Sequence, residues 1–112
     1  MAAPYQTTYR AHITTNGTTP LAAESCYVAG VIISISALGT NWSVSVVDTA
    51  TPAMAIVPWT VLSATNPPEN PWVIDLTHAR AFMYNSVNVL TSGTTPGTLD
   101  VWVVATDQPT SY

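Results

Sequence analysis

The chain has 112 residues, only 7% of them are charged, and lysine is absent. Its length suffices for one domain that buries roughly 65% of its unfolded surface, and its net charge of −4 gives no reason to bind nucleic acid or an anionic membrane. A typical soluble domain has about 25% charged residues, which keep a free surface solvated. Because this chain has so few, we expect other subunits of an assembly to cover much of its surface.

Strand-forming residues dominate between turn signals, which come about every eight to twelve residues. No window shows the apolar stripe of an amphipathic helix, and the chain leaves no room for the long crossovers that parallel sheets need. The predicted strands, in chain order, span Thr8–Thr15, Ser25–Ser36, Trp42–Asp48, Met54–Val57, Trp72–Leu76, Ala79–Leu90 and Thr98–Thr106.

Turn residues separate these strands. Asn16–Gly17 predicts a turn that tolerates positive φ, and Leu38–Asn41 and Asp48–Pro52 predict two more. Alternation within the strands places three sets of residues on one face each. These sets are Val31, Ile33 and Ile35; Trp42, Val44 and Val46; and Leu99, Val101, Val103 and Ala105.

Proline and glycine shape the second half of the chain. Pro58 is expected to stop the strand Met54–Val57, and Trp59–Leu62 to extend it past a bulge. Ser63–Pro71 predicts a loop that is extended at its paired prolines. Thr91–Gly97 predicts a hairpin loop before the last strand.

The pattern predicts one all-β domain, an antiparallel β-sandwich or jelly roll of seven to eight short strands. Residues 1–8 and 107–112 are expected to form arms that a neighbouring subunit orders. Free-standing sheets protect their edges with lysine, inward charge or bulges. Because lysine is absent, either loops and prolines cap the edges or the edges pair with neighbouring subunits.

Few residues are candidates for chemistry. Cys26 is the single cysteine and lies among apolar neighbours, which indicates a small buried residue without a disulfide. His78 lies in the turn Asp75–Arg80, and we expect it to pair with Asp75 or the backbone rather than to act as a base. Asp75 and Asp100 are a weak candidate for the carboxylate pair of a glycosidase. We therefore expect no enzymatic activity, catalytic residue, metal ligand or cofactor.

The aromatic residues carry more information. Trp42 shares its face with two valines, which indicates core packing, whereas Trp102 shares its face with Asp100 and Thr106, which favours an interface. Trp59 and Trp72 flank the proline loop, and both interpretations stay open for them. The aromatic residues that we expect at an interface are Trp59, Trp72, Trp102, Tyr5 and Tyr112.

Three segments carry a resemblance over about residues 10–106. The first segment is Thr-Thr-Asn-Gly-Thr-Thr before a strand with Tyr27-Val-Ala-Gly-Val31. The second is Trp42-Ser-Val-Ser-Val-Val-Asp48, and the third is Thr-Ser-Gly-Thr-Thr-Pro-Gly-Thr-Leu-Asp-Val-Trp-Val. Together they resemble small β-sandwich virion proteins of tailed bacteriophages. The resemblance implies a non-enzymatic head decoration (cement) protein on the capsid surface. Its partners would be the major capsid protein and its own copies, often as trimers.

Two other functions remain as alternatives. The first is a phage tail, neck or fibre component. The second is a carbohydrate-binding module that stacks sugars on Trp59, Trp72 or Trp102. The segment Met1–Tyr5 lacks the basic and apolar regions of a signal peptide, so we expect synthesis in the host cytoplasm.

Overall fold

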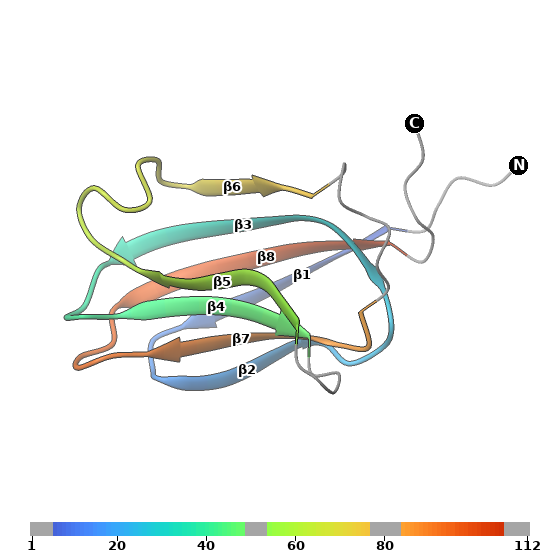
Figure 1. Ribbon diagram of the computed structural model, residues 1–112, viewed down its shortest axis with the longest axis horizontal. Helices are drawn as coiled ribbons and strands as arrows, with labels where there is room; N and C mark the ends of the chain where they lie inside the picture. Colours follow the sequence, from blue (N-terminus) through green and yellow to red (C-terminus); the bar gives the residue numbers. More distant parts are fainter. Residues whose placement is uncertain (1–5, 49–53, 77–83, 107–112) are drawn as a thin grey trace, which may run out of the picture.

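The computed structural model describes residues 6–48, 54–76 and 84–106, which form eight strands (Figure 1). None of the described segments is a helix long and apolar enough to cross a membrane. The strands are β1 Gln6–Ile13, β2 Gly17–Ala22, β3 Tyr27–Ala37, β4 Ser43–Asp48, β5 Met54–Val61, β6 Trp72–Asp75, β7 Val87–Ser92 and β8 Thr98–Thr106.

The strands form two four-stranded sheets, in the orders β1-β8-β3-β6 and β2-β7-β4-β5. Each pairing between neighbouring strands is antiparallel. The first strand pairs with the last, the second with the seventh, the third with the sixth and the fourth with the fifth. This nested pairing is the wrapping of a jelly roll, so the predicted all-β sandwich is confirmed.

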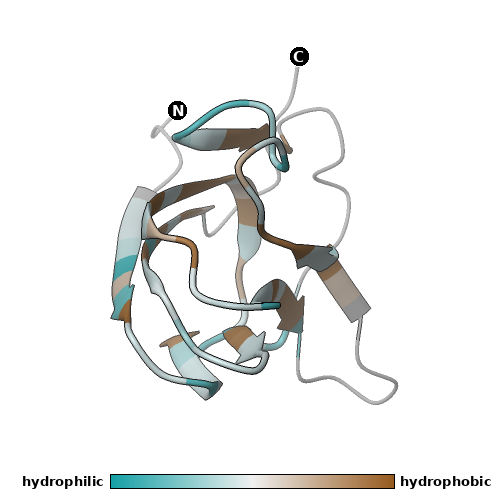
Figure 2. Cartoon of the chain, turned by 90° about the vertical axis from the view of Figure 1, so that its left-hand side faces the viewer, coloured by the Kyte–Doolittle hydropathy of each residue, from teal (hydrophilic) through white to brown (hydrophobic). Residues whose placement is uncertain are grey.

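The core contains alternate residues of the central strands, which are buried between the two sheets. Figure 2 shows the strands of both sheets coloured by hydropathy, with hydrophobic stretches in each sheet. The three predicted sets supply nine of the twenty buried hydrophobic residues of the described core, and Trp42 is fully buried as predicted. Burying one Val or Leu side chain stabilises the fold by about 1.5–3 kcal/mol, so these rows make a large hydrophobic contribution. The fully buried members of the three sets are Val31, Ile33, Trp42, Val44, Val46, Leu99, Val101 and Val103.

Two loops at one end of the sandwich pack backbone against backbone. The N–H of Thr40 donates to the carbonyl oxygen of Thr95 at 2.8 Å. Gly39 has φ of +67°, and a Cβ placed on it would collide with the backbone of Thr95 and Pro96. Glycine is therefore required at position 39 both by its backbone conformation and by the lack of space.

Two sequence-based predictions are wrong. Thr91–Gly97 is not a hairpin loop, because β7 and β8 belong to different sheets and the chain crosses between them. The strand also does not stop at Pro58, since β5 runs from Met54 to Val61. Proline is tolerated there because β5 is an edge strand, and the register opposes residues 58 and 59 to the single residue Ser45. The expected continuation past a bulge is thereby confirmed.

Strand β2 has no counterpart among the predicted strands. It is rich in threonine, contains Pro20 and lacks a clear apolar alternation, which hides it from a pattern search. The N-terminal arm is also shorter than predicted, because residues 6–8 pair with β8. Several predicted segments lie outside the described residues. They are most of the turn Asp48–Pro52, the first residues of the predicted strand 79–90, and the parts of the two arms at residues 1–5 and 107–112.

The edges of the sheets differ in how they are protected. Strands β2 and β5 contain Pro20 and Pro58 and both have register shifts, while β6 has only four residues. These features discourage pairing with another strand, which favours the first of the two expectations for those edges. Strand β1, in contrast, pairs with β8 over eight residues without a shift, and its outward side chains include Arg10 and His12.

Candidate interaction surface

The outer face of the sheet β1-β8-β3-β6 carries a row of four side chains. The register places Arg10 opposite Trp102, Trp102 opposite Ile32, and Ile32 opposite Val73. Paired residues of antiparallel strands point to the same side, and the neighbouring residues Val101 and Val103 fill the core. The row therefore faces away from the core. It is apolar over three strands and cationic at β1.

A groove of about 460 Å³ lies along this row. Trp102 and Ile32 line the groove and are half-buried, and Val73 at the β6 end of the row is 60% exposed. Apolar side chains on three adjacent strands thus remain in contact with solvent, which indicates a surface suited to a partner. The residues that line the groove are Thr8, Ile32, Ser34, Pro71, Trp102 and Val104.

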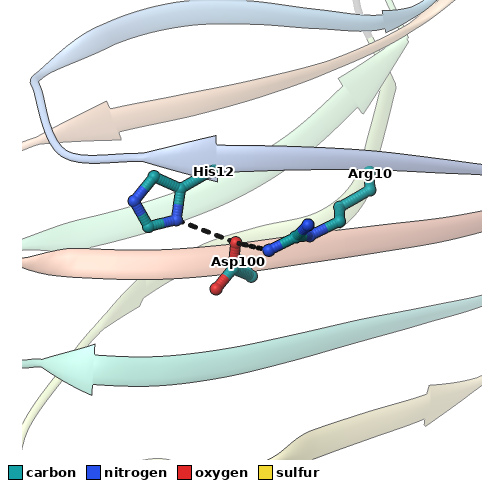
Figure 3. Close-up of polar contacts among 3 residues, drawn as sticks. All are labelled: Arg10, His12 and Asp100. Carbon is teal, nitrogen blue, oxygen red and sulfur yellow. Dashed lines mark hydrogen bonds and ion pairs between the residues drawn. The ribbon is translucent and has the colours of Figure 1, made fainter.

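A polar cluster of Arg10, His12 and Asp100 lies on the same face of the sheet as Trp102 (Figure 3). Arg10 Nη2 donates to Asp100 Oδ1 at 3.1 Å, and His12 Nδ1 lies 2.9 Å from the same oxygen. Because a carboxylate oxygen accepts, Nδ1 carries the proton in this contact. The Arg10 guanidinium also lies 5.6 Å from the centre of the Trp102 ring, within cation–π range. Asp100 therefore joins the two strands β1 and β8 through their side chains.

This arrangement determines the ionisation of Asp100. The hydrogen bond from His12 has the largest effect and lowers the pKa of the Asp100 carboxyl group. Burial, the next largest effect, opposes it, and the hydrogen bond from Arg10 and the charges of Arg10 and His12 lower the pKa further, so that it lies below its ordinary value. The side chain of Asp100 is 15% exposed, whereas those of Arg10 and His12 are 60% and 57% exposed. The Asp100 carboxylate is thus the least exposed member of the cluster, and the side chains of Arg10 and His12 are presented to solvent.

A second apolar surface lies on β5, in the other sheet. Trp59 and Val61 are 53% and 56% exposed, and we call them the β5 patch. Val61 pairs with Ser43, whereas the intervening Thr60 pairs with the buried Val44. The alternation therefore directs Val61, and Trp59 two residues earlier, away from the core. Strand β5 contains no charged residue, so covering this patch removes no charge from water.

The predicted interface residues have different positions. Trp59 and Trp102 lie on the two surfaces just described. Trp72 is half-buried, pairs with the core residue Ile33 and packs against the core. Of the two interpretations left open for Trp72, this position favours core packing over an interface. Tyr5 and Tyr112 lie outside the described residues.

The candidates for chemistry do not converge in the described part of the chain. Asp75 pairs with Gly30 and Asp100 with Ser34, on opposite sides of β3. Four residues along a strand span about 13 Å, more than the roughly 5–10 Å between the carboxylates of glycosidases. No group of three or more His, Cys, Asp or Glu side chains among the described residues is placed to hold a metal ion. His78 and Arg80 lie outside these residues.

Cys26 is buried, as the sequence indicates. Its backbone N–H and carbonyl group exchange hydrogen bonds with Tyr84 at 2.9 and 2.8 Å. Burial raises the pKa of the Cys26 thiol, and the charge of Asp48 raises it further. These features describe a packed thiol held mostly in its protonated form.

Sequence reasoning missed the polar cluster and the apolar row. Alternation along β8 places Asp100 and Trp102 on one face, but the partners Arg10, His12 and Ile32 follow only from the register of three strands. A pattern within one strand contains no information on its register against another strand. In comparisons with protein-family models, curated proteins and solved structures, the chain has no match.

Proposed function

We propose that this protein is a non-enzymatic structural protein of a virion, and specifically a decoration protein that stabilises a phage capsid by bridging shell subunits. The observation that carries the proposal is the pair of apolar surfaces on opposite sheets, the groove and the β5 patch. A chain with 7% charged residues that also exposes Trp59, Val61 and Val73 is suited to be covered by other subunits.

The fold and the sequence add support. Eight-stranded jelly rolls occur in viral capsid and lectin domains, which is an analogy at the level of the fold. The resemblance of three segments to small virion proteins of tailed phages points to the first of these classes. In this proposal the partners are the major capsid protein and further copies of the chain, and the protein is located on the capsid surface.

The stabilising effect follows from repetition. Burial of apolar surface contributes about 25 cal/mol per Å², and the loss of rotational and translational freedom offsets much of this gain in a single contact. On a closed shell, each copy makes several contacts at once, so weak contacts add to a strong attachment. The protein would therefore raise the temperature at which the shell ruptures.

Two measurements test this proposal. Quantitative mass spectrometry of purified virions gives the number of copies per particle, and we expect hundreds, in proportion to the major capsid protein. A handful of copies would assign the protein to the tail, neck or fibre instead, and absence from the particles would overturn the virion function. Shells with and without the protein are then heated, and equal rupture temperatures would contradict the stabilising function.

Carbohydrate binding is the second candidate, and the surroundings of Trp102 favour it specifically. A ring beside Arg10, His12 and Asp100 combines an apolar face with hydrogen-bonding groups, the combination found in small-molecule sites. A glycan array with the isolated protein tests this function. Binding that Trp102→Ala abolishes would favour a carbohydrate-binding module over a decoration protein.

A further inference from the structure

We propose that Asn16 is a site of spontaneous deamidation and that the fold controls the reaction. Asn16 lies in the connection between β1 and β2, directly before Gly17. Asparagine is a chemically labile residue, because the next backbone nitrogen can attack its side-chain carbonyl carbon. In the folded protein, two hydrogen bonds hold the Asn16 amide and slow this attack. The inference goes beyond the proposed function, because it concerns a covalent change of the protein itself.

The reaction needs no reagent other than water. A bond forms between the backbone nitrogen of Gly17 and Cγ of Asn16, the bond from Cγ to Nδ2 breaks, and ammonia leaves with the proton of the Gly17 N–H. The product is a cyclic succinimide. Water then opens the ring at either of its two carbonyl carbons, which yields aspartate or isoaspartate. Neither step oxidises or reduces the chain.

Gly17 is well suited to supply the attacking nitrogen. Glycine has no side chain that obstructs the approach to Cγ. A Cβ placed on Gly17 would meet no atom within 4 Å outside its chain neighbours, but the φ of +133° is strained for any residue that has a side chain. The backbone conformation therefore keeps glycine at this position. Asn16 is exposed, so water reaches the ring that forms.

The Asn16 amide is held at both of its polar atoms. Its Oδ1 accepts from the indole Nε1 of Trp42 at 2.9 Å, and its Nδ2 donates to the carbonyl oxygen of Gly93 at 3.0 Å. The indole nitrogen can only donate and the carbonyl can only accept, so one orientation of the amide satisfies both partners. Ring closure makes Cγ tetrahedral and expels Nδ2. The amide must therefore leave these partners, and the buried Trp42 then lacks its acceptor.

Deamidation removes contacts that hold the turn. Aspartate keeps an oxygen for Trp42 but has no donor for the carbonyl oxygen of Gly93. Isoaspartate carries the main chain through Cβ and Cγ, which lengthens the backbone directly before Gly17. Gly17 is the first residue of β2 and pairs with Thr91 of β7. We therefore expect the isoaspartate form to unfold at a lower denaturant concentration than the unmodified protein.

Peptide mapping by mass spectrometry measures the reaction. The protein is kept at mildly alkaline pH in buffer and in guanidinium chloride, and chromatography separates the peptides that contain asparagine, aspartate and isoaspartate. Release of the amide from two hydrogen bonds of ordinary strength should make Asn16 react on the order of tenfold to a hundredfold more slowly in the folded protein. This comparison uses the unmodified chain and depends on no variant.

Trp42→Phe tests the source of the protection. It keeps an aromatic ring in the core and removes the indole donor, so Asn16 in the folded variant should react about tenfold faster. Trp59→Phe is the matched control, because it makes the same exchange at an exposed residue of β5 and should leave the rate unchanged. Asn85, exposed and followed by Ser86, reports any general loosening of the variant. We expect its rate to be the same in all three proteins.

Four results would overturn the inference. They are no deamidation of Asn16 in the unfolded chain, equal rates in the folded and unfolded protein, equal rates in the folded Trp42→Phe and Trp59→Phe variants, and an acceleration in Trp42→Phe that is as large at Asn85 as at Asn16. The last result would attribute the protection to global stability rather than to the two hydrogen bonds. None of these measurements involves a virion, so the inference and the proposed function can fail independently.

Discussion

The side-chain oxygen Oδ1 of Asn16 accepts a hydrogen bond from the indole Nε1 of Trp42 at 2.9 Å, although the two residues lie 26 positions apart in the sequence. Asn16 belongs to the turn between β1 and β2, and its own amide group donates to the carbonyl oxygen of Gly93 at 3.0 Å. Trp42 is fully buried, so its one donor must find a partner inside the protein. Asn16 thus supplies the hydrogen-bond acceptor for the buried Trp42 indole and joins three segments of the chain.

We expect Asn16→Ala to lower the free energy of unfolding by about 1–3 kcal/mol, because a buried N–H loses its acceptor. Asn16→Asp is the matched variant. It keeps an oxygen for Trp42 and loses only the donor to Gly93, so its loss should be smaller. Urea denaturation followed by Trp fluorescence measures both. Equal stability of the Ala variant and the unmodified protein would show that water or another group replaces Asn16.

Substitutions on alternate residues of β8 test the register of the core. Leu99 is fully buried, whereas Val104 lines the open groove. Leu99→Ala should cost about 2–5 kcal/mol because it leaves a cavity, and Val104→Ala only about 1 kcal/mol, because its side chain is already partly solvated. Chemical denaturation measures the difference. A larger loss for Val104→Ala than for Leu99→Ala would contradict the assignment of the two faces.

The stability of the fold should depend on pH through Asp100. Its pKa lies below the ordinary value of about 3.9, so the folded state binds this proton less readily than the unfolded state does. The resulting stabilisation is complete above about pH 4 and decreases as the pH falls through the folded pKa. NMR titration of the Asp100 carboxyl group measures that pKa directly.

His12→Ala provides the control for this pH dependence, because it removes the hydrogen bond that contributes most to the lowered pKa. We expect the Asp100 pKa to rise toward its ordinary value in this variant. Asp100→Asn should remove the contribution of this group to the acid dependence of stability. An Asp100 pKa at its ordinary value in the unmodified protein would contradict the contacts with His12 and Arg10.

The thiol of Cys26 should react slowly in the folded protein. Burial and the nearby charge of Asp48 raise its pKa, and the thiolate is the reactive form. We expect alkylation at neutral pH to be at least tenfold slower than in urea, where the thiol regains its ordinary pKa of about 8.5. Mass spectrometry of the time course measures both rates. Equal rates would indicate that the packing around Cys26 opens readily.

Local patterns in the sequence were sufficient for much of the fold. The predicted strand Thr98–Thr106 is confirmed with both of its ends, because small and branched apolar residues recur there at every second position between clear turn signals. Strand β2 escaped prediction because its threonines and Pro20 follow no such period. Pro58 was misinterpreted because proline ends a central strand but is tolerated in an edge strand. A local sequence pattern does not reveal whether a strand lies at the edge or in the centre of its sheet.

The sequence by itself determined the all-β class, the turns at Asn16–Gly17 and Leu38–Asn41, the buried position of Trp42 and the scarcity of charge, because each depends on residue type and on periodicity within a few neighbours. The tertiary structure alone decided which strands are partners, that residues 93–97 cross between sheets, and that Arg10, His12 and Asp100 meet beside Trp102. These contacts join residues about 90 positions apart, and their register follows from how two sheets bury their apolar faces together.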